Sequence, residues 1–342
     1  MQLPAVFGRY RAALDDILGE IVGQGGPPLL YRMMRYQLGW EDEEGRVLTN
    51  GGGKALRPTL CLLACEAVGG QWQRALPAAA ALELVHNFSL IHDDIQDQDR
   101  ERRHRPTVWA LWGQPQAINA GDSMLTLARL AVLRLADVGV APAKVVQAAR
   151  ALDESCLEMI EGQCLDLGFE ECLDVGLDAY LQMIAKKTGA LFGCSLYLGA
   201  LVESDDPQVA EALRRCGRLL GSAFQVRDDM LGVWGAQEGT GKPVGADIRR
   251  RKKSLPIVYA LAQAQGAARQ RLHQLYRKPS LDADDVAEVL QTLDAAGAAD
   301  YCLQTAAQKK AEALAELAPL GLVGSAYDEL KELAGFLLER DY

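Results

Sequence analysis

Apolar residues recur at three- and four-residue spacing over long stretches of this 342-residue chain. That spacing collects the apolar side chains on one face of a helix, and it predicts amphipathic α-helices. No stretch alternates convincingly between apolar and polar residues with a period of two, as a half-buried strand would. The predicted helices cover residues 10–22, 56–67, 78–97, 123–135, 145–165, 177–201, 208–231 and 284–293, with more helix towards the C-terminus.

Short breaks rich in glycine, proline or aspartate separate these helices. The sequence shows no internal repeat and no low-complexity linker, so we interpret residues 1–342 as one all-α bundle domain. The longest break, residues 235–251, is rich in glycine and charge. Its length makes it a candidate functional loop.

Apolar residues make up 49% of the chain, which is enough for a large core, and the abundance of leucine and alanine favours helix. The formal net charge of −10 argues against a general nucleic-acid binder, which would carry a basic face. Basic residues nevertheless cluster at 100–105 and 249–253, and such local clusters can bind anions.

The eight cysteines form no CxxC pair and no zinc-ligand spacing, so we expect buried free thiols in a reducing, cytoplasmic setting. The N-terminal residues lack the charged and apolar segments of a secretory signal. The longest uncharged runs, 106–121 and 188–202, are shorter than the roughly 20 apolar residues that cross a bilayer. We therefore expect no membrane span.

Adjacent aspartates occur at five places, and three of these have structural explanations. The pairs at 205–206 and 284–285 stand at predicted helix starts, where carboxylates cap backbone N–H groups. The pair at 15–16 lies on the polar face of an amphipathic helix, where water solvates it. The pairs at 93–94 and 228–229 lie inside strongly apolar helices, and they are the candidates for chemistry.

The first candidate pair is followed by a third carboxylate, Asp97. At about 100° per residue, Asp97 lies about 40° from Asp93 and about 60° from Asp94, so the three share a helix face. Three like charges flanked by apolar residues repel one another unless a cation lies between them. Oxygen-only ligands favour magnesium, which commonly takes one or two carboxylates together with substrate phosphate.

The second candidate pair, Asp228-Asp229, follows Gln225 by about one helical turn and shares a face with it. Two such helices, facing each other, would hold metal ions against a diphosphate. Basic residues stand near both places, although each taken singly is more often a solvated charge. They are Arg102, Arg103, Lys242 and Lys253, together with Lys54 and Arg57 after three glycines at a predicted helix start, a reasonable phosphate clamp.

This combination resembles the trans-prenyl diphosphate synthase family, in the family's order and over nearly the whole chain. The resemblance implies an all-α isoprenoid-synthase bundle with a central cavity, and head-to-tail joining of isopentenyl diphosphate to an allylic diphosphate. The matching segments are GGGKALRP (51–58), ELVHNFSLIHDDIQDQDRERRHRPTVW (83–109), Gly162-Gln163 with Asp166, Lys187-Thr188, FQVRDD (224–229) and GKPVGADIRRRKKSLP (241–256).

The resemblance also implies roles for individual residues. Three magnesium ions would be bound by Asp93, Asp94 and Asp97 on one wall and by Asp228 and Asp229 on the other. Isopentenyl diphosphate would be held by Lys54, Arg57, His86 and Arg103. The allylic diphosphate (dimethylallyl, geranyl or farnesyl) and its departing charge would be held by Arg102, Lys187, Thr188, Gln225, Lys242 and Lys253. The family is dimeric, and we expect a homodimer.

Two positions depart from the family's pattern. Gly232 stands where the second aspartate-rich region commonly has its last aspartate, so Asp228 and Asp229 must supply that wall. Ala55 replaces an arginine that often follows the loop lysine, which removes one phosphate contact.

Product length, by the same resemblance, is set by the helix before the first aspartate motif. The aromatic Phe88 and the small Ser89 in that helix resemble short-chain enzymes, in particular those that make geranylgeranyl diphosphate; farnesyl diphosphate is the alternative product. On an ideal helix Phe88 points away from Asp93, so an ordinary core role stays open for it. Val85, one turn deeper, is the next candidate for the channel floor.

Other classes fit less well. A class I terpene cyclase would need a Ser- or Thr-containing triad in the second region, and the sequence after Asp229 has none. A head-to-head synthase lacks the glycine–lysine–arginine loop, and a non-catalytic synthase subunit should have lost aspartates. The segment 239–242 is not a nucleotide-binding P-loop, because Pro243 follows its lysine and Ala236 stands where its first glycine should be.

Overall fold

The computed structural model describes residues 4–23, 28–48, 52–235 and 244–339. Helices dominate these ranges, which confirms the all-α prediction, and a short antiparallel ribbon joins β1 (Glu101–Arg102) to β2 (Arg105–Pro106). The α-helices are α1 (Val6–Arg9), α2 (Arg11–Val22), α3 (Pro28–Gln37), α4 (Leu56–Ala67), α5 (Leu76–Gln96), α6 (Val108–Trp112), α7 (Gln114–Leu133), α8 (Pro142–Glu170), α9 (Leu177–Ile184), α10 (Ala190–Glu203), α11 (Pro207–Trp234), α13 (Ala246–Arg249), α14 (Leu255–Gln263), α15 (Gly266–Tyr276), α16 (Ala283–Ala295), α17 (Ala298–Leu317) and α18 (Ser325–Glu339).

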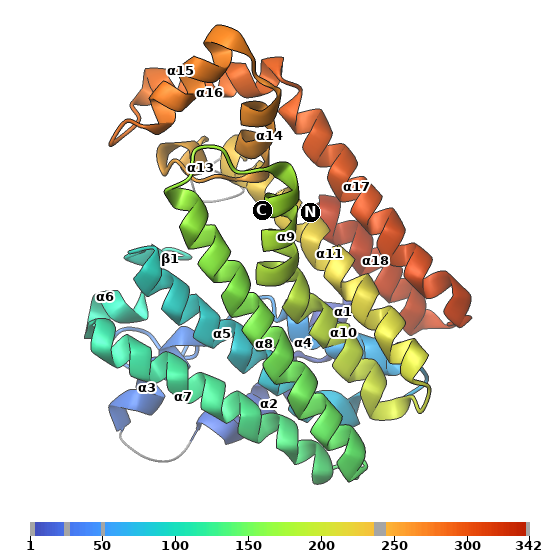
Figure 1. Cartoon of the computed structure of the whole chain (residues 1–342). Helices are drawn as coiled ribbons and strands as arrows, with labels where there is room; N and C mark the ends of the chain where they lie inside the picture. The colour runs from blue at the N-terminus through green and yellow to red at the C-terminus, as the bar shows by residue number, and fades with distance from the viewer. Residues whose placement is uncertain (1–3, 24–27, 49–51, 236–243, 340–342) are drawn as a thin grey trace.

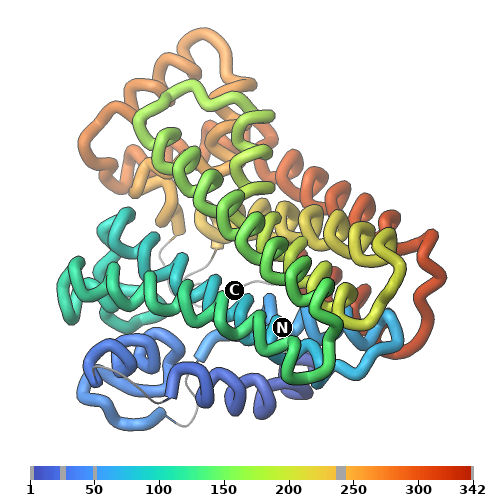
Figure 2. Tube along the Cα trace, turned by 60° about the horizontal axis from the view of Figure 1, so that its bottom comes forward, coloured from blue at the N-terminus to red at the C-terminus, as the bar shows by residue number. Residues whose placement is uncertain are grey.

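The long helices form a bundle in which α10 is almost wholly buried. Figure 1 shows α8 between α5 and α7 on one side and α10 and α11 on the other. In both views the helices α13 to α16 gather at one end of the molecule, whereas α2 and α3 lie at the opposite end (Figure 2). The two aspartate pairs lie on α5 and α11, and these two helices are therefore supported by different parts of the chain.

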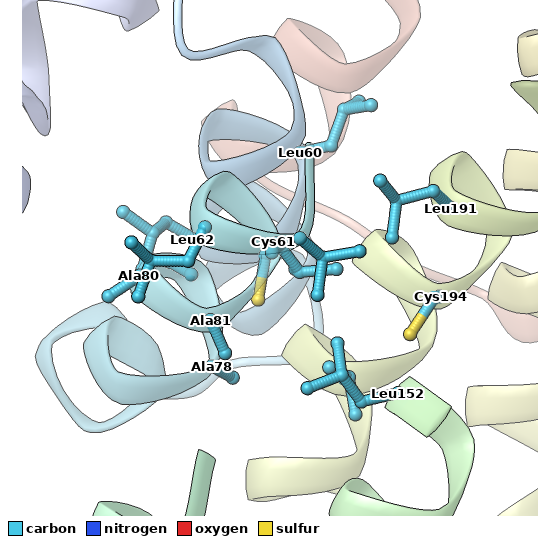
Figure 3. Packing of buried hydrophobic residues seen from close by; sticks show 14 of the residues in the cluster. Leu60, Cys61, Leu62, Ala78, Ala80, Ala81, Leu152, Leu191 and Cys194 are labelled. Atoms are coloured by element: carbon cyan, nitrogen blue, oxygen red, sulfur yellow. The ribbon is translucent and has the colours of Figure 1, made fainter. Parts of the chain in front are cut away.

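The main core lies where α4, α5, α8 and α10 meet. Cys61 of α4 and Cys194 of α10 are buried there among leucine and alanine side chains, as Figure 3 shows. The helices come unusually close because small residues line their crossings. A Cβ added at Gly199 would lie 2.9 Å from the carbonyl carbon of Cys61 and closer still to its oxygen. Burial of this core supplies the hydrophobic free energy that holds the bundle together, about 1.5–3 kcal/mol for each large apolar side chain.

A second apolar cluster anchors the chain around the end of α11. Val233 of α11 and Ile248 of α13 are fully buried in it, together with side chains of α14, α15 and α16 such as Ile257, Leu275 and Val289. Because this cluster fixes both α11 and α13, it also fixes the backbone that bears the second aspartate pair and the basic segment after it.

Most predicted boundaries agree with the structure to within a few residues, but two differ. Helix α7 begins at Gln114 rather than at 123, because Pro115 occupies its first turn, where a missing N–H costs nothing. The predicted helix 177–201 is interrupted by a π-helical turn, Ala185–Gly189. Such turns are rare and frequently mark functional sites.

The structural explanations for the other aspartate pairs hold. The side chain of Asp206 accepts a hydrogen bond from the backbone N–H of Gln208 at 2.9 Å and so caps α11. Asp285 forms a capping box with Asp282, which is the residue that caps α16. Asp15 pairs with Arg11 on the surface of α2. None of the described helices is both long enough and apolar enough to cross a membrane.

Candidate functional site

The first aspartate-rich segment lies at the C-terminal end of α5, and its carboxylates point in two directions. Burial raises the pKa of Asp94 to about 6, and Asp94 accepts a hydrogen bond from Nε of Arg102 at 2.7 Å. Burial also raises the pKa values of Asp93 and Asp97, and for both of them Lys187 is the strongest opposing charge. Asp93 and Asp97 therefore share the face towards Lys187, whereas Asp94, only 2% exposed, turns to Arg102.

The π-helical turn brings Lys187 to this wall. A Cβ added at Gly162 of α8 would lie 2.6 Å from Cα of Lys187 and closer still to its nitrogen, so only glycine allows the contact. Nζ of Lys187 then donates to Asp166 of α8 at 2.5 Å. The GQxxD and lysine–threonine motifs of the sequence are thus one structural unit, with the glycine setting the distance and the aspartate holding the lysine.

The same turn connects to the second wall through Thr188. Its hydroxyl donates to Oε1 of Gln225 at 2.8 Å, and Nε2 of Gln225 donates to Asp229 at 3.1 Å. Asp229 is 1% exposed and also accepts hydrogen bonds from the hydroxyl of Tyr180 and the backbone N–H of Leu255. Burial raises the pKa of Asp229 to about 6. With three protein donors, Asp229 holds the start of α14 and the Gln225 side chain, while its neighbour Asp228 is exposed at the surface of the site.

The lysine that faces these carboxylates is Lys252. Burial alone would lower the pKa of Lys252, but the carboxylates around it raise the pKa well above its ordinary value. Asp247 contributes most to that rise, followed by Asp229, Asp166 and Asp228. These acids come from α8, α11 and α13, so Lys252 lies where the two walls approach each other.

Lys253, which the sequence predicts for this role, points elsewhere. Its Nζ donates to the backbone carbonyls of Glu170 and Arg251 at 3.2 and 3.4 Å, and it lies 5.3 Å from the ring centroid of Tyr276. Lys253 is buried, and burial lowers its pKa. Two adjacent lysines leave a turn in opposite directions, and only the fold decides which one enters the site.

A cluster of cations lies beside the first wall. Burial lowers the pKa of Arg57 to about 10, although Glu83 and Asp228 oppose the change. Burial and the neighbouring cations, with Arg57 first among them, lower the pKa of His86 well below its ordinary value. The pKa of Arg103 is lowered too, by burial and then by Arg102. Guanidinium groups stay charged under such pKa shifts. The cluster is therefore strongly positive and partly shielded from water, and a bound anion would reduce the repulsion among its charges.

The glycine loop covers this cluster. Gly53 lies so near the Arg103 guanidinium that an added Cβ would be 2.9 Å from its Nη1. Arg11 of α2 donates to the carbonyl of Gly53 at 2.8 Å and fixes the loop from the other side. Lys54 follows on the exposed side of the loop. A cavity of about 480 Å³ opens here, lined in part by Gly52, Asp94, Arg102, Arg103 and Arg105.

The residues predicted to set product length lie on α5, one to two turns before the first wall. Phe88 is buried with its ring edge against His92, at 5.5 Å between ring centroids. The His92 ring rests on Gly121 of α7, where an added Cβ would lie 2.5 Å from its Cδ2. The hydroxyl of Ser89 donates to the carbonyl of His86, and Val85 is fully buried.

Among the described members of the predicted site, Lys253 points away from the carboxylates. Lys242 lies outside the described residues. Sequence reasoning missed Lys252, Asp247, Tyr180 and Glu83. Lys252 stands beside Lys253 in the basic run, and Glu83 and Asp247 lie inside the matching segments 83–109 and 241–256, whereas no sequence signal pointed to Tyr180.

Two carboxylate walls around Lys252, with an arginine-lined cavity beside the first wall, form a site in an all-α bundle that is suited to a divalent cation and phosphate groups. A family model described as Polyprenyl synthetase matches residues 40–293. A (2E,6E)-farnesyl diphosphate synthase of Mycobacterium tuberculosis is 40% identical over 316 residues, which cover 92% of this chain and 87% of the relative. A geranylgeranyl diphosphate synthase of the same organism is also 40% identical, over 92% of this chain and 88% of the relative.

A solved structure extends the likeness to the fold. The geranylgeranyl pyrophosphate synthase of Corynebacterium glutamicum, complexed with isoprenyl diphosphate and magnesium, has a TM-score of 0.83 and 28% identity, covering 99% of this chain and 100% of that one. The chain belongs to the polyprenyl synthetase family. It is a prenyltransferase of the short-chain prenyl diphosphate synthase type.

Proposed function

We propose that this enzyme joins isopentenyl diphosphate head-to-tail to an allylic diphosphate and that its main product is geranylgeranyl diphosphate. The observation that supports the proposal is the pairing of two carboxylate walls, both of which act on Lys252, with a cavity beside the first wall that Arg102, Arg103 and Arg105 line. One diphosphate has a place at the carboxylates and the other at the arginines.

The donor set between the walls fits magnesium. Asp93, Asp97 and Asp228 offer only oxygen ligands. Burial disfavours the charged forms of Asp93 and Asp97 and raises their pKa values. Among the described residues, no three acidic, histidine or cysteine side chains converge on one point, so phosphate and water must complete any coordination. Asp93, Asp97 and Asp228 would be ligands, whereas Asp94 and Asp229 would hold Arg102 and Gln225 in place. Three ions are the expected number.

Magnesium, when bound, stabilises negative charge on the leaving diphosphate. Lys187 and Lys252 add positive charge there, fixed in advance by Asp166 and by the acids around Lys252, and Arg102, held by Asp94, adds positive charge on the other side of the first wall. Thr188 and Gln225, which share a hydrogen bond, would orient the leaving diphosphate. The allylic C–O bond breaks as this charge is accepted.

The second substrate lies beside the first. Lys54, Arg57, His86 and Arg103 would hold isopentenyl diphosphate so that its double bond attacks the allylic carbon. A proton then leaves the new chain, and the released diphosphate is the nearest base. The bound substrates must keep water from the cation, which water would otherwise quench.

The buried ring of Phe88 supports a short product, because a bulky side chain on α5 limits how far a growing chain can extend. The farnesyl product is the second candidate, since a farnesyl and a geranylgeranyl synthase are equally similar to this chain. Chromatography of products formed with excess isopentenyl diphosphate tests the choice. A twenty-carbon product in the wild type, and longer products from Phe88→Ala, are expected; if Phe88→Ala leaves the length unchanged, the floor belongs to another residue, with Val85 the next candidate.

We further propose that the enzyme is a homodimer in a reducing, cytoplasmic setting. Large apolar side chains stand exposed along α7 and α8, which form one outer face in Figure 1. They are Ile118, Leu130, Leu133, Val146, Leu157 and Ile160. Light scattering at micromolar concentration should return twice the mass of the chain, and a monomer mass would contradict this part. The eight free cysteines suit a reducing compartment.

A further inference from the structure

A buried carboxylate lies near the cation cluster of the site and forms an ion pair with none of its described members. Glu83 of α5 stands three residues before His86 and is 8% exposed. Its Oε2 atom is buried and has no hydrogen-bond partner among the described residues. Burying a carboxylate with one oxygen unpaired costs free energy, so its place in this fold calls for a compensating role.

Three arginines from three separate elements act on the Glu83 carboxylate. Burial raises the pKa of Glu83, and Arg57 of α4 opposes that rise most strongly, while Arg103 of the β1–β2 turn and Arg11 of α2 oppose it as well. The influence is mutual, because Glu83 is also the strongest group that opposes the lowering of the Arg57 and Arg103 pKa values. Glu83 is therefore a counter-charge that the arginines share.

We propose that Glu83 is a positioning residue for the isopentenyl diphosphate site. Its negative charge keeps the guanidinium groups of Arg57 and Arg103 together while no diphosphate is bound. Glu83 itself need not touch the substrate, since it acts through the arginines.

A hydrogen-bonded asparagine fixes the Glu83 carboxylate. Asn87, one turn further along α5, donates from Nδ2 to the carbonyl of Glu83 at 2.9 Å and to its Oε1 at 3.2 Å. Gln37 of α3 donates to Oδ1 of Asn87 at 3.4 Å, and Asn87 is 6% exposed. These contacts restrain the carboxylate from turning towards a single arginine, so its charge stays shared.

The other contacts of the two arginines do not replace this charge. Arg57 lies 5.1 Å from the ring centroid of Phe192, and its Nε is buried without a hydrogen-bond partner among the described residues. The other acids that act on Arg57 and Arg103 are Asp228 and Asp94, which belong to the carboxylate walls. Without Glu83 the guanidinium groups would repel one another and move apart, and a diphosphate would have to bring them together again at a cost in affinity.

The inference rests on the proposed function, and equilibrium binding of each substrate alone tests it without turnover. Glu83→Gln keeps the size of the side chain but removes its charge, and calorimetric titration with isopentenyl diphosphate should show a loss of affinity of about 10-fold or more. Affinity for geranyl diphosphate in the presence of magnesium should stay close to unchanged. Glu83→Asp, which keeps the charge, should retain more affinity for isopentenyl diphosphate than Glu83→Gln does.

Control variants separate a role in the site from a role in the fold. Glu203→Gln removes an acid that pairs with Arg74 at 2.7 Å, and it should leave both affinities unchanged. In a chain with Arg57→Ala, Glu83→Gln should cause a clearly smaller loss than in the wild type, because Glu83 acts through Arg57. Thermal unfolding identifies the variants that keep the fold. If Glu83→Gln does not fold, Asn87→Ala, which releases the carboxylate, should weaken isopentenyl diphosphate binding in the same selective way.

The outcomes that overturn the inference are distinct from failure of the proposed function. An unchanged affinity of Glu83→Gln for isopentenyl diphosphate would overturn it, and a higher affinity would show that the carboxylate repels the substrate instead. Equal losses for both substrates would assign Glu83 to the fold rather than to this site. In these cases the wild type still binds both substrates and the proposed function stands. If the wild type does not bind isopentenyl diphosphate, both fail.

Discussion

The guanidinium of Arg250 pairs with both carboxylate oxygens of Asp99. Asp99 follows the first wall, and its backbone carbonyl also accepts Nε1 of Trp109 at 2.7 Å. Arg250 follows α13 and stands two residues before Lys252. This clasp therefore ties the segment after the first aspartate motif to the basic segment after the second, across the mouth of the site.

We predict that Arg250→Ala affects catalysis more than stability. The side chain of Arg250 is 55% exposed, and ion pairs of this kind contribute at most about 1 kcal/mol to the free energy of unfolding. Loss of the clasp should lower kcat/KM for the allylic substrate a few-fold at low salt, and less at high salt, where the pair is already screened. Arg269→Ala, which removes a peripheral pair with Asp174, is the matched control. An unchanged kcat/KM at low salt would show that the clasp does not position the basic segment.

Adjacent lysines provide a second test. Lys252→Ala removes the cation that faces the carboxylates, and turnover should fall by about 100-fold or more. Lys253→Ala removes hydrogen bonds to two backbone carbonyls, so it should cost about 1 kcal/mol of stability and leave turnover within a few-fold of wild type. Steady-state kinetics and thermal unfolding of both variants give the comparison. The reverse order of effects would return the catalytic role to Lys253.

His86 tests whether the two substrates have separate sites. Arg57, Arg103 and Arg102 are the charges that act on the ring, in that order. His86→Ala should raise KM for isopentenyl diphosphate about 10-fold or more, because one donor to a buried anion is lost, and leave KM for the allylic substrate close to unchanged. His273→Ala, in the peripheral helix α15, is the control. Equal losses for both substrates would mean that the structure holds one merged site.

The same variant should change the pH dependence of stability. The pKa of His86 is lowered well below the ordinary 6.5, by burial first and then by the three arginines, so the unfolded chain binds a proton more readily than the folded protein. Stability is therefore lost as the pH falls through 6.5. His86→Ala should lose less of its thermal midpoint than wild type between about pH 7.5 and about pH 5.5. Parallel curves for the two proteins would contradict the neutral state of His86.

Much of this fold follows from periodicity alone. The helices around Cys61, Asp93 and Asp228 were predictable because long apolar stripes fix helix and face together. The interruption at Lys187 was not, since a π-helical turn depends on the close approach of Gly162 from another helix. The choice between Lys252 and Lys253 likewise depends on tertiary contacts.

The expected shared face of the first motif was right for Asp93 and Asp97, but an ideal helix could not show that Asp94 turns towards Arg102. At Gly232 the sequence indicates only a missing carboxylate. The group that fills its place, the carboxylate of Asp247, comes from a separate helix, and no local pattern connects the two positions.

Release of inorganic diphosphate tests the central claim most directly. The account predicts release only when isopentenyl diphosphate, an allylic diphosphate and magnesium are all present. In Asp93→Ala the rate should fall by about two orders of magnitude or more while the fold persists, since the lost charge stabilisation raises the barrier by at least about 3 kcal/mol. Comparable release from the allylic diphosphate alone, or near wild-type turnover by Asp93→Ala with magnesium present, would contradict it.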